Sequence, residues 1–529
     1  MKSFAKIIRL MFSSGKKTLL EAFFILLLLL AFETSIPIGI NYVISVLEEE
    51  KNVFILLIGV VVFVFAYIFV SLFSALNTKM YIRIGNSLLW NMREEIYKVI
   101  WKADYFENVQ KNKDKYKFVL SNQTYTAFAI AVVYSLGGIT NVLTACVFLL
   151  VVFIYSVPAG ITLIICIAVS LLISFLTGKS ILNGFEAFTK AQEKDTAQIY
   201  ETVDLIEATR TNGLEEYYLK KNKQIHNEFM KLSERTESRS SFCEAIENGI
   251  NSLIYIIVSG IFLLTGEASG GEIVTILFVT NLTLDISHRI QRQLQVIIKN
   301  IPVFNNVVEV METPLKGGKE IGDINNIEIE NLSFEIEERK VFSDVNASIK
   351  KGDNVLISGA NGSGKSSLLK MLLGLYSPTA GSIKLNGEDI SVYDSNLLFN
   401  EICYISQEEL MLNETVEEYL KAVSHSDRSA EYIKELCNKV NLNKEIEVIE
   451  ENGTTLSGGE KKKLFMVKCL LKNKASVVIL DEIDAGVDAE TKVIWKKIEN
   501  ELLNDRTKIV FKISHIDNDT EGINKFIKM

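Results

Sequence analysis

The stretch Gly359–Ser366, which reads G-A-N-G-S-G-K-S, constrains the fold of this chain more than any other feature. It follows the apolar run Val355–Ile357 and precedes the helical pattern Ser367–Leu373. Glycines let the backbone turn so that successive N–H groups point at phosphate oxygens, and the N-terminus of the following helix adds partial positive charge. The pattern therefore predicts a strand, a phosphate-binding loop and a helix in succession.

The side chains of this loop suit a nucleotide with a magnesium ion. Lys365 can reach the β- and γ-phosphates, and the Ser366 hydroxyl can hold Mg²⁺. The alternative is a chance glycine turn before a helix, and the strand and helix patterns on either side argue against it. The residues predicted to bind the nucleotide here are Gly359, Asn361, Gly362, Ser363, Gly364, Lys365, Ser366 and Ser367.

Apolar residues are unevenly distributed along the chain. Hydrophobic residues make up 48% of the 529 residues although 23% are charged, because long apolar runs fill the first half and the last ~200 residues resemble a soluble domain. Each run is long enough to span a bilayer. The six predicted spans are Leu19–Leu47, Val53–Leu76, Ala127–Ile154, Ala159–Leu176, Ala245–Leu264 and Glu272–Ile290.

Two long polar segments, residues 77–126 and 179–245, separate the spans and are basic, whereas the outer turns are short and neutral or acidic. The positive-inside rule therefore places both termini in the cytoplasm of a multi-pass membrane protein, which we expect in the bacterial plasma membrane. We predict a multi-domain chain. Residues 1–310 form an all-α six-helix transmembrane domain, 311–322 a linker, and 323–529 a cytoplasmic α/β domain.

Charge and cysteine usage exclude two classes of function. The net charge is −9 and neither half of the chain is strongly basic, so we expect no nucleic-acid partner. None of the six cysteines forms a C-x-x-C pair, which favours reduced packing residues over a metal site or a disulfide framework.

Two apolar runs in the last part of the chain end in chemically active residues. Val477–Leu480 leads into Asp481 and Glu482, and Ile509–Ile513 leads to His515. Strands that alternate with helices predict a mostly parallel sheet, whose carboxyl ends meet at one rim where ligands bind. Asp481 can hold Mg²⁺, and Glu482 can polarise a water that attacks the γ-phosphate. A capping pair at a strand end is the alternative.

The stretch Leu456–Glu460, which reads L-S-G-G-E before a helical pattern, predicts a second anion site. With the phosphate loop and Asp481–Glu482, it resembles the signature of ATP-binding-cassette (ABC) proteins, and the six spans resemble an exporter half-transporter. The resemblance implies ATP and Mg²⁺ as cofactors. It gives Ser457, Gly458 and Gly459 a role in ATP binding.

Other positions match the family one by one. By resemblance, Gln407 is the Q-loop residue that senses Mg²⁺ and the transmembrane domain, Asp488 is the D-loop aspartate, and His515 is the switch histidine at the γ-phosphate. A lone histidine is otherwise most often a packing residue. The family implies a dimer, a homodimer or a heterodimer with a second half-transporter, in which each ATP lies between the phosphate loop of one chain and Ser457–Gly459 of the other. The bends near Asp104–Phe106 and Ala208–Leu214 resemble coupling helices.

One position departs from the family's pattern, and it concerns binding of the adenine base. The family stacks adenine on an aromatic residue two positions after Phe334, where this chain has Ile336. Loss of one base–aromatic stack costs ~1–3 kcal/mol. Phe342 is a weak substitute. Since Glu482 and His515 are retained, we predict active hydrolysis.

Acidic residues within the spans point to the cargo. Glu33 and Asp285 are candidate substrate-binding residues in a central cavity, which favours a cationic or amphipathic cargo such as a peptide or a drug-like compound. In the alternative, Asp285 caps the membrane exit and Glu33 pairs with a neighbouring helix.

Three functions follow from the sequence. The first is an ATP-driven exporter that moves cargo, for example a bacteriocin-like peptide, out of the cytoplasm by alternating access. The second is a lipid or glycolipid flippase with the same engine, in contact with membrane lipid. The third is a regulatory membrane protein that binds ATP without pumping, which measured turnover would separate from the first two.

Overall fold

The computed structural model describes residues 2–50, 53–265, 270–336, 339–406, 411–424, 428–442, 448–449, 455–481, 488–513 and 520–529. The chain forms two compact units. The first contains residues 1–99 and 112–313, and the second contains residues 100–111 and 314–529. A short segment from the first half of the sequence is therefore part of the second unit.

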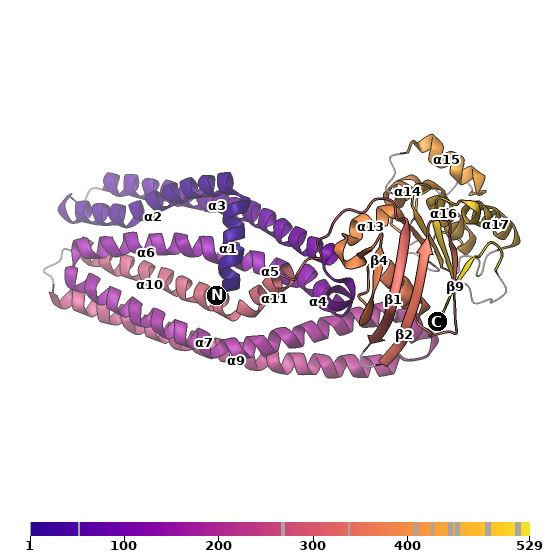
Figure 1. Cartoon of the computed structure of the whole chain (residues 1–529). Coiled ribbons are helices and arrows are strands. Elements are labelled where there is room, and N and C mark those ends of the chain that lie inside the picture. Colours follow the sequence, from indigo (N-terminus) through magenta and orange to yellow (C-terminus); the bar gives the residue numbers. More distant parts are fainter. Residues whose placement is uncertain are drawn as a thin grey trace. The chain divides into compact units, whose positions relative to one another are not determined.

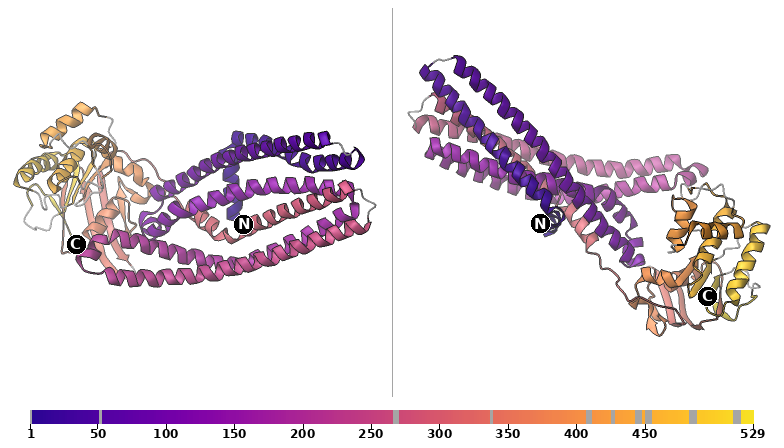
Figure 2. Two further views of the ribbon diagram at one scale, coloured as in Figure 1. Left: turned by 180° about the vertical axis from the view of Figure 1, so that it is seen from behind. Right: turned by 90° about the horizontal axis from the view of Figure 1, so that it is seen from above.

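The first unit is entirely helical in its described residues. Long helices run beside one another, and α7 and α9 stay side by side along their length in every view (Figure 1 and Figure 2). The helices are α1 Lys2–Ser14, α2 Lys16–Glu50, α3 Val53–Lys102, α4 Lys113–Phe118, η2 Val119–Gln123, α5 Thr124–Ala129, η3 Ile130–Tyr134, α6 Ser135–Tyr155, α7 Val157–Asp204, α8 Ile206–Thr211, α9 Glu215–Thr265, α10 Gly270–Lys299 and α11 Ile301–Met311.

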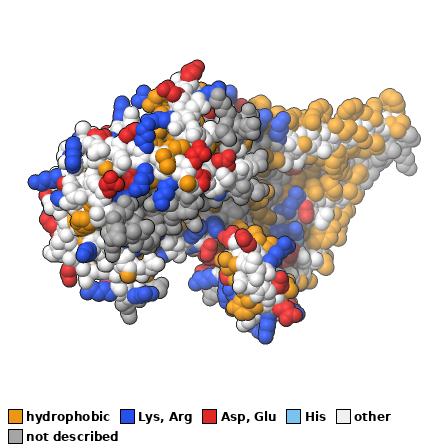
Figure 3. Space-filling model, turned by 90° about the vertical axis from the view of Figure 1, so that its right-hand side faces the viewer, with side chains coloured by type: hydrophobic (Ala, Val, Ile, Leu, Met, Phe, Trp, Pro, Cys, Tyr) orange, Lys and Arg blue, Asp and Glu red, His pale blue; other side chains and the backbone are white. Residues whose placement is uncertain are grey.

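Among the described residues, six helices are long and apolar enough to cross a membrane, as predicted. Their contacting faces build a core from α6, α7, α9 and α10, with Phe148, Leu163 and Val258 almost completely buried. Their outer faces are also apolar, because α3 exposes residues such as Phe65 and Ile68, and apolar side chains cover the long helices in Figure 3. Apolar surface of this extent suits lipid better than water.

Local sequence explains where these helices begin and end. Ser156 caps α7 by accepting a hydrogen bond from the Ala159 N–H at 3.4 Å, with Pro158 in the first turn, where no backbone donor is needed. Pro302 has the same place in α11, and Asn300, the N-cap of α11, separates it from α10.

The second unit contains a five-stranded, fully parallel sheet in the order β6-β7-β8-β3-β9. Alternate residues of its strands enter two cores, so that Ile479 packs on one side and Val478 on the other. Burial on both faces explains the continuous apolar runs of these strands. The strands are β3 Asn354–Ser358, β6 Ile402–Ile405, β7 Val477–Asp481, β8 Ile509–Ile513 and β9 Lys525–Lys528.

A second, antiparallel sheet with the order β2-β1-β4-β5 packs on one of these cores. The sequence predicts a mostly parallel sheet and does not predict this separate antiparallel one. Its strands are β1 Asn326–Ile336, β2 Arg339–Lys350, β4 Ala380–Leu385 and β5 Glu388–Asp389. The helical elements of this unit are η1 Tyr105–Gln110, α12 Lys365–Leu372, η4 Ile390–Val392, α13 Ser395–Glu401, α14 Val416–Ser424, α15 Ala430–Lys439, α16 Gly458–Leu471 and α17 Ala489–Asn504.

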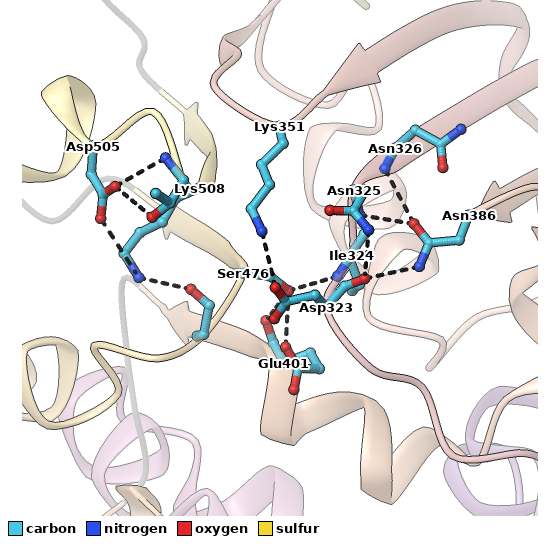
Figure 4. Close-up of polar contacts among 12 residues, drawn as sticks. Asp323, Ile324, Asn325, Asn326, Lys351, Asn386, Glu401, Ser476, Asp505 and Lys508 are labelled. Carbon is cyan, nitrogen blue, oxygen red and sulfur yellow. Dashed lines mark hydrogen bonds and ion pairs between the residues drawn. The ribbon is translucent and has the colours of Figure 1, made fainter.

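Polar contacts tie the two sheets together at the amino ends of β6 and β7 (Figure 4). The Ser476 hydroxyl accepts a hydrogen bond from the Ile324 N–H and donates one to Glu401, both at 3.0 Å. The side-chain oxygen of Asn386 accepts the Asn325 N–H at 2.8 Å. The segment that enters β1 is thereby fixed to both sheets.

Candidate functional site

The predicted phosphate loop connects β3 to α12, as the sequence indicates. All five residues of β3 are buried, so the loop leaves from a fixed strand end. Gly364 is the N-cap of α12 and has a φ of +98°, a conformation that side chains rarely adopt. A β-carbon at Gly364 would lie 2.7 Å from the Phe342 ring, so both the backbone and the space require glycine.

Gly359 has a similar spatial constraint at the start of the loop. A β-carbon there would lie 2.7 Å from the main-chain oxygen of Met529 and 2.8 Å from Ser363 Oγ. The loop is held close to the end of β9, because the Met529 N–H donates to the Ser358 carbonyl at 2.9 Å.

Two side chains show that the loop fits an anion. The Lys365 ammonium donates to the carbonyls of Gly359 at 2.7 Å and Ala360 at 3.2 Å, so it lies across the loop. Its third proton has no partner among the described residues. Ser363 Oγ is buried and also lacks a hydrogen-bond partner in this part of the chain. Buried polar atoms are normally satisfied, so both groups suit a phosphate ligand.

The remaining loop residues predicted to bind the nucleotide differ in exposure. Asn361, Gly362 and Ser366 are exposed, and Ser367 is half-buried. The Ser366 hydroxyl is therefore accessible to a metal ion.

Asp481 is the last residue of β7. In the sheet, β8 lies between β7 and β3, so Asp481 and the phosphate loop are at the same carboxyl-end rim. Its Oδ2 accepts a hydrogen bond from the Tyr404 hydroxyl at 3.3 Å. Lys468, from α16, fixes the Tyr404 backbone by donating to its carbonyl at 3.0 Å. Carboxylate and hydroxyl oxygens are ligands that Mg²⁺ prefers, so Asp481 and Ser366 fit such an ion.

Ser457–Gly459 and Asp488, which the sequence predicts to bind ATP, lie together. Ser457 caps α16 in a capping box, in which its hydroxyl accepts the Glu460 N–H and Glu460 accepts the Ser457 N–H. Asp488 caps α17 by accepting the Thr491 N–H at 2.7 Å. A β-carbon at Gly459 would lie 3.2 Å from Asp488 Oδ2, which shows that the two helix N-termini are adjacent.

These caps keep two carboxylates charged. Hydrogen bonds from the Ser457 side chain and backbone hold the pKa of Glu460 below its ordinary value. Hydrogen bonds from the Thr491 backbone and side chain do the same for the pKa of Asp488, and Lys463 contributes to the shift. Gly458 lies in the first turn of α16, so the glycines present backbone N–H groups at a helix N-terminus.

Three predicted catalytic residues, Gln407, Glu482 and His515, lie outside the described residues. The strands that lead to them, β6, β7 and β8, are neighbours in one parallel sheet. Ile336 occupies the end of β1, and Phe342 is only 8% exposed and packs on the phosphate loop. That burial leaves little of the Phe342 ring for an adenine base.

Residues 342–485 match the ABC transporter family (ABC_tran). This match includes the phosphate loop, Ser457–Gly459 and Asp481. In fold, the chain is similar to a bacterial Atm1-family ABC exporter solved with ATP bound, with a TM-score of 0.85 over 97% of this chain and 93% of that chain at 15% identity.

Three relatives have names that give them different roles. A probable ABC transporter ATP-binding/permease protein of Haemophilus influenzae is 34% identical over 37% of this chain and 36% of its own length. A β-(1→2)glucan export protein of Agrobacterium fabrum is 26% identical over 50% and 47%, and an ATP-dependent lipid A-core flippase of Francisella tularensis is 29% identical over 44% and 40%. The chain thus spans less than half the length of these relatives.

Among the membrane-length helices, the two predicted cargo residues differ in environment. Asp285 lies on α10, is exposed and accepts a 2.8 Å ion pair from Arg289, one turn further on. Glu33, on α2, accepts a hydrogen bond from Thr144 at 3.4 Å, and the Arg289 charge acts on it as well. The sequence analysis missed Arg289, which the spacing of four residues after Asp285 could have indicated.

The same unit contains a buried polar network that sequence reasoning also missed. Glu247 on α9 is 2% exposed and accepts hydrogen bonds from Thr177 at 2.8 Å and Gln295 at 2.6 Å. One turn away, Gln291 on α10 donates to Ser170 on α7 at 2.6 Å. Polar residues at four-residue spacing within the spans were the available signal, and their mutual satisfaction gives them a helix-packing role.

Proposed function

We propose that this half-transporter hydrolyses ATP and uses the energy to move a cargo out of the cytoplasm across the plasma membrane. One observation carries the proposal: within the described residues, a glycine-dependent phosphate loop, whose Ser363 hydroxyl has no hydrogen-bond partner there, occurs together with six membrane-length helices. The relatives and the Atm1-family fold support it, because an export protein and a flippase are among them.

In this proposal each residue of the rim has one task. Lys365 binds the terminal phosphates. Mg²⁺ would be held by Ser366, Asp481 and Gln407, and when bound it would neutralise phosphate charge. Glu482 polarises the attacking water, and His515 contacts the γ-phosphate. We propose that residues 311–322 link the membrane domain to the cassette.

A second half-transporter completes the site. The N-termini of α16 and α17 bring Ser457, Gly459 and Asp488 together on helices other than α12, which carries Lys365. We propose that this pair of N-termini closes on the phosphate loop of a partner chain, either a second copy or a different half. The partner's identity decides whether the chain is active alone.

The test is ATP turnover by the purified protein in lipid vesicles, with Glu482→Gln as the matched variant. Turnover in the wild type that disappears in Glu482→Gln supports hydrolysis by two copies of this chain. Absence of turnover in a protein that still binds ATP would favour a missing partner half or the regulatory alternative, and addition of candidate half-transporters separates these two.

For the cargo, we propose an amphipathic molecule bound along α10. Asn281, Asp285 and Arg289 form an exposed polar stripe on a membrane-length helix. Charged side chains against lipid are costly, so this stripe needs a water-filled path or a second half. Arg289 means that the path offers both signs of charge, in contrast to the purely acidic cavity predicted from Glu33 and Asp285.

Cargo-stimulated ATP turnover tests this surface. Glu33→Gln and Asp285→Asn are expected to change stimulation by peptides or lipids, whereas Glu215→Gln at the exposed start of α9 is the matched control. Unchanged stimulation and transport in both variants would remove these acids from the cargo path.

A further inference from the structure

Residues 100–111, which continue the chain from α3, are fixed to the cassette by a specific set of contacts. Asp104 receives an ion pair from Lys316 at 2.6 Å and a hydrogen bond from Ser377 at 3.2 Å. The Tyr376 hydroxyl donates to Gln110 at 2.9 Å. These contacts hold η1 in one orientation on the cassette surface.

Three phenylalanines continue inward from this segment. The rings of Phe106 and Phe334 are 5.8 Å apart in an edge-to-face arrangement, and the rings of Phe334 and Phe342 are 6.3 Å apart. Phe334 is 2% exposed and Phe342 8% exposed, so the inner two rings are part of the core. We call Phe106, Phe334 and Phe342 the aromatic row.

The inner end of the aromatic row is the phosphate loop. Phe342 packs so closely on Gly364 that a β-carbon there would lie 2.7 Å from its ring. Gly364 sets the first turn of α12, which carries Lys365.

We propose that the aromatic row couples the phosphate loop to residues 100–111, with Phe106, Phe334 and Phe342 as positioning residues for the nucleotide site. The proposal rests on the proposed function, since it identifies how nucleotide binding reaches the membrane helices. Close-packed rings cannot deform gradually, so a shift of Gly364 on phosphate binding displaces Phe342 and then its neighbours. By reciprocity, a change at Phe106 alters ATP affinity.

The test is a double-mutant cycle on the affinity of the full-length protein in nanodiscs for a fluorescent ATP analogue. Phe106→Leu is expected to weaken binding about fivefold, although Phe106 lies at the outer end of the row. In a Phe342→Leu background the same substitution is expected to change affinity less than about twofold, because the row is already interrupted.

Tyr105→Leu is the matched control, because Tyr105 is on the same segment but is 40% exposed and lies outside the row. It is expected to leave affinity unchanged. An unchanged affinity in Phe106→Leu, or an equal loss in both backgrounds, would overturn the aromatic row. A wild type that binds no ATP analogue would overturn the proposed function as well, so the two failures are distinguishable.

A second measurement avoids a core substitution. Hydrogen exchange of residues 364–372 without nucleotide is expected to be faster in Phe106→Leu than in the wild type, with Tyr105→Leu equal to the wild type. Equal exchange in all three proteins would show that the row does not position the loop.

Discussion

The two rims of the five-stranded sheet differ in whether their buried polar groups have hydrogen-bond partners. At the amino-end rim, Asn354 donates its side-chain amide to two carbonyls, at 2.8 and 2.7 Å, and Ser476 is hydrogen-bonded on both sides. At the carboxyl-end rim, Ser363 Oγ has no partner among the described residues, and Lys365 donates only to carbonyls of its own loop there.

This difference separates stability from function. A satisfied buried group contributes to the free energy of unfolding, whereas an unsatisfied one is a cost that a ligand can remove. We therefore expect substitutions at the amino-end rim to lower stability and to leave nucleotide affinity intact. Substitutions at the carboxyl-end rim should do the reverse.

The largest effect is expected for Lys365→Ala. Removing the ammonium group should lower ATP turnover by about 10²-fold or more, since charge stabilisation at the phosphates is lost, with little change in the thermal midpoint. ATPase assays and thermal unfolding followed by the fluorescence of buried Trp495 measure the two quantities. Full turnover in this variant would show that the loop does not bind the phosphates.

The second-largest effect is expected for Gly364→Ala, which should lower both the stability and the ATP affinity. Its φ of +98° and the 2.7 Å approach to Phe342 predict a loss of ~1–3 kcal/mol of stability together with weaker ATP binding. Isothermal titration and thermal unfolding test this. A variant with wild-type affinity would show that the loop tolerates a different backbone.

Ser476→Ala is expected to destabilise the cassette by roughly 1–3 kcal/mol, because the Ile324 N–H loses its buried acceptor. ATP affinity should stay at the wild-type value. The check is denaturant unfolding reported by Trp495, with Ser391→Ala, which is hydrogen-bonded near the surface to Asp389, as the control. A loss of affinity without a loss of stability would reverse the assignment of the rims.

Ser457→Ala removes the cap of α16 and should cost about 1 kcal/mol. Thr, which retains the hydroxyl, is the conservative comparison at this position. If Ser457→Ala were more stable than Ser457→Thr, the cap would have no structural role.

The smallest effect concerns acid. Burial raises the pKa of Asp104, but hydrogen bonds from Lys316 and the Glu107 N–H outweigh it and leave the pKa below its ordinary value. The associated stability is therefore complete above the ordinary aspartate pKa of about 3.9 and is lost as the pH falls toward the lowered value. We expect a loss of below about 1 kcal/mol, measured as the difference in unfolding midpoint between the wild type and Asp104→Asn at pH 7 and at about pH 2.5, which is below the ordinary aspartate pKa.

If the difference between these two proteins were the same at both pH values, the ionised carboxylate would not hold η1. If the difference in unfolding midpoint were larger at the lower pH, the predicted sign of the pH dependence would be wrong.

Sequence patterns predicted the elements that depend on local residues. The strand before Gly359, the buried strand before Asp481 and the six apolar spans are all present, because burial on both faces or in lipid leaves continuous apolar runs. For the site, glycine spacing was informative since only glycine fits at Gly359 and Gly364.

Features that depend on distant contacts were not predictable in the same way. The aromatic row joins residues more than two hundred positions apart, and no periodicity marks Phe106 as a partner of Phe334. The Arg289 pair with Asp285 follows a helical spacing, but its effect on Glu33 depends on how α2 and α10 pack. The sequence likewise carried no signal that β1, β2, β4 and β5 would form a separate antiparallel sheet.

The most direct measurement of the central claim is the shift in thermal midpoint on addition of ATP, made on the wild type, Lys365→Ala and Ser476→Ala in parallel. A ligand that binds only the folded state raises the midpoint, and the rise grows with the logarithm of the ligand concentration divided by Kd. We predict the same ATP-induced rise in the wild type and in Ser476→Ala, from a lower starting midpoint in the latter, and no rise in Lys365→Ala. A full rise in Lys365→Ala, or its loss in Ser476→Ala, would contradict the assignment of ATP binding to the carboxyl-end rim.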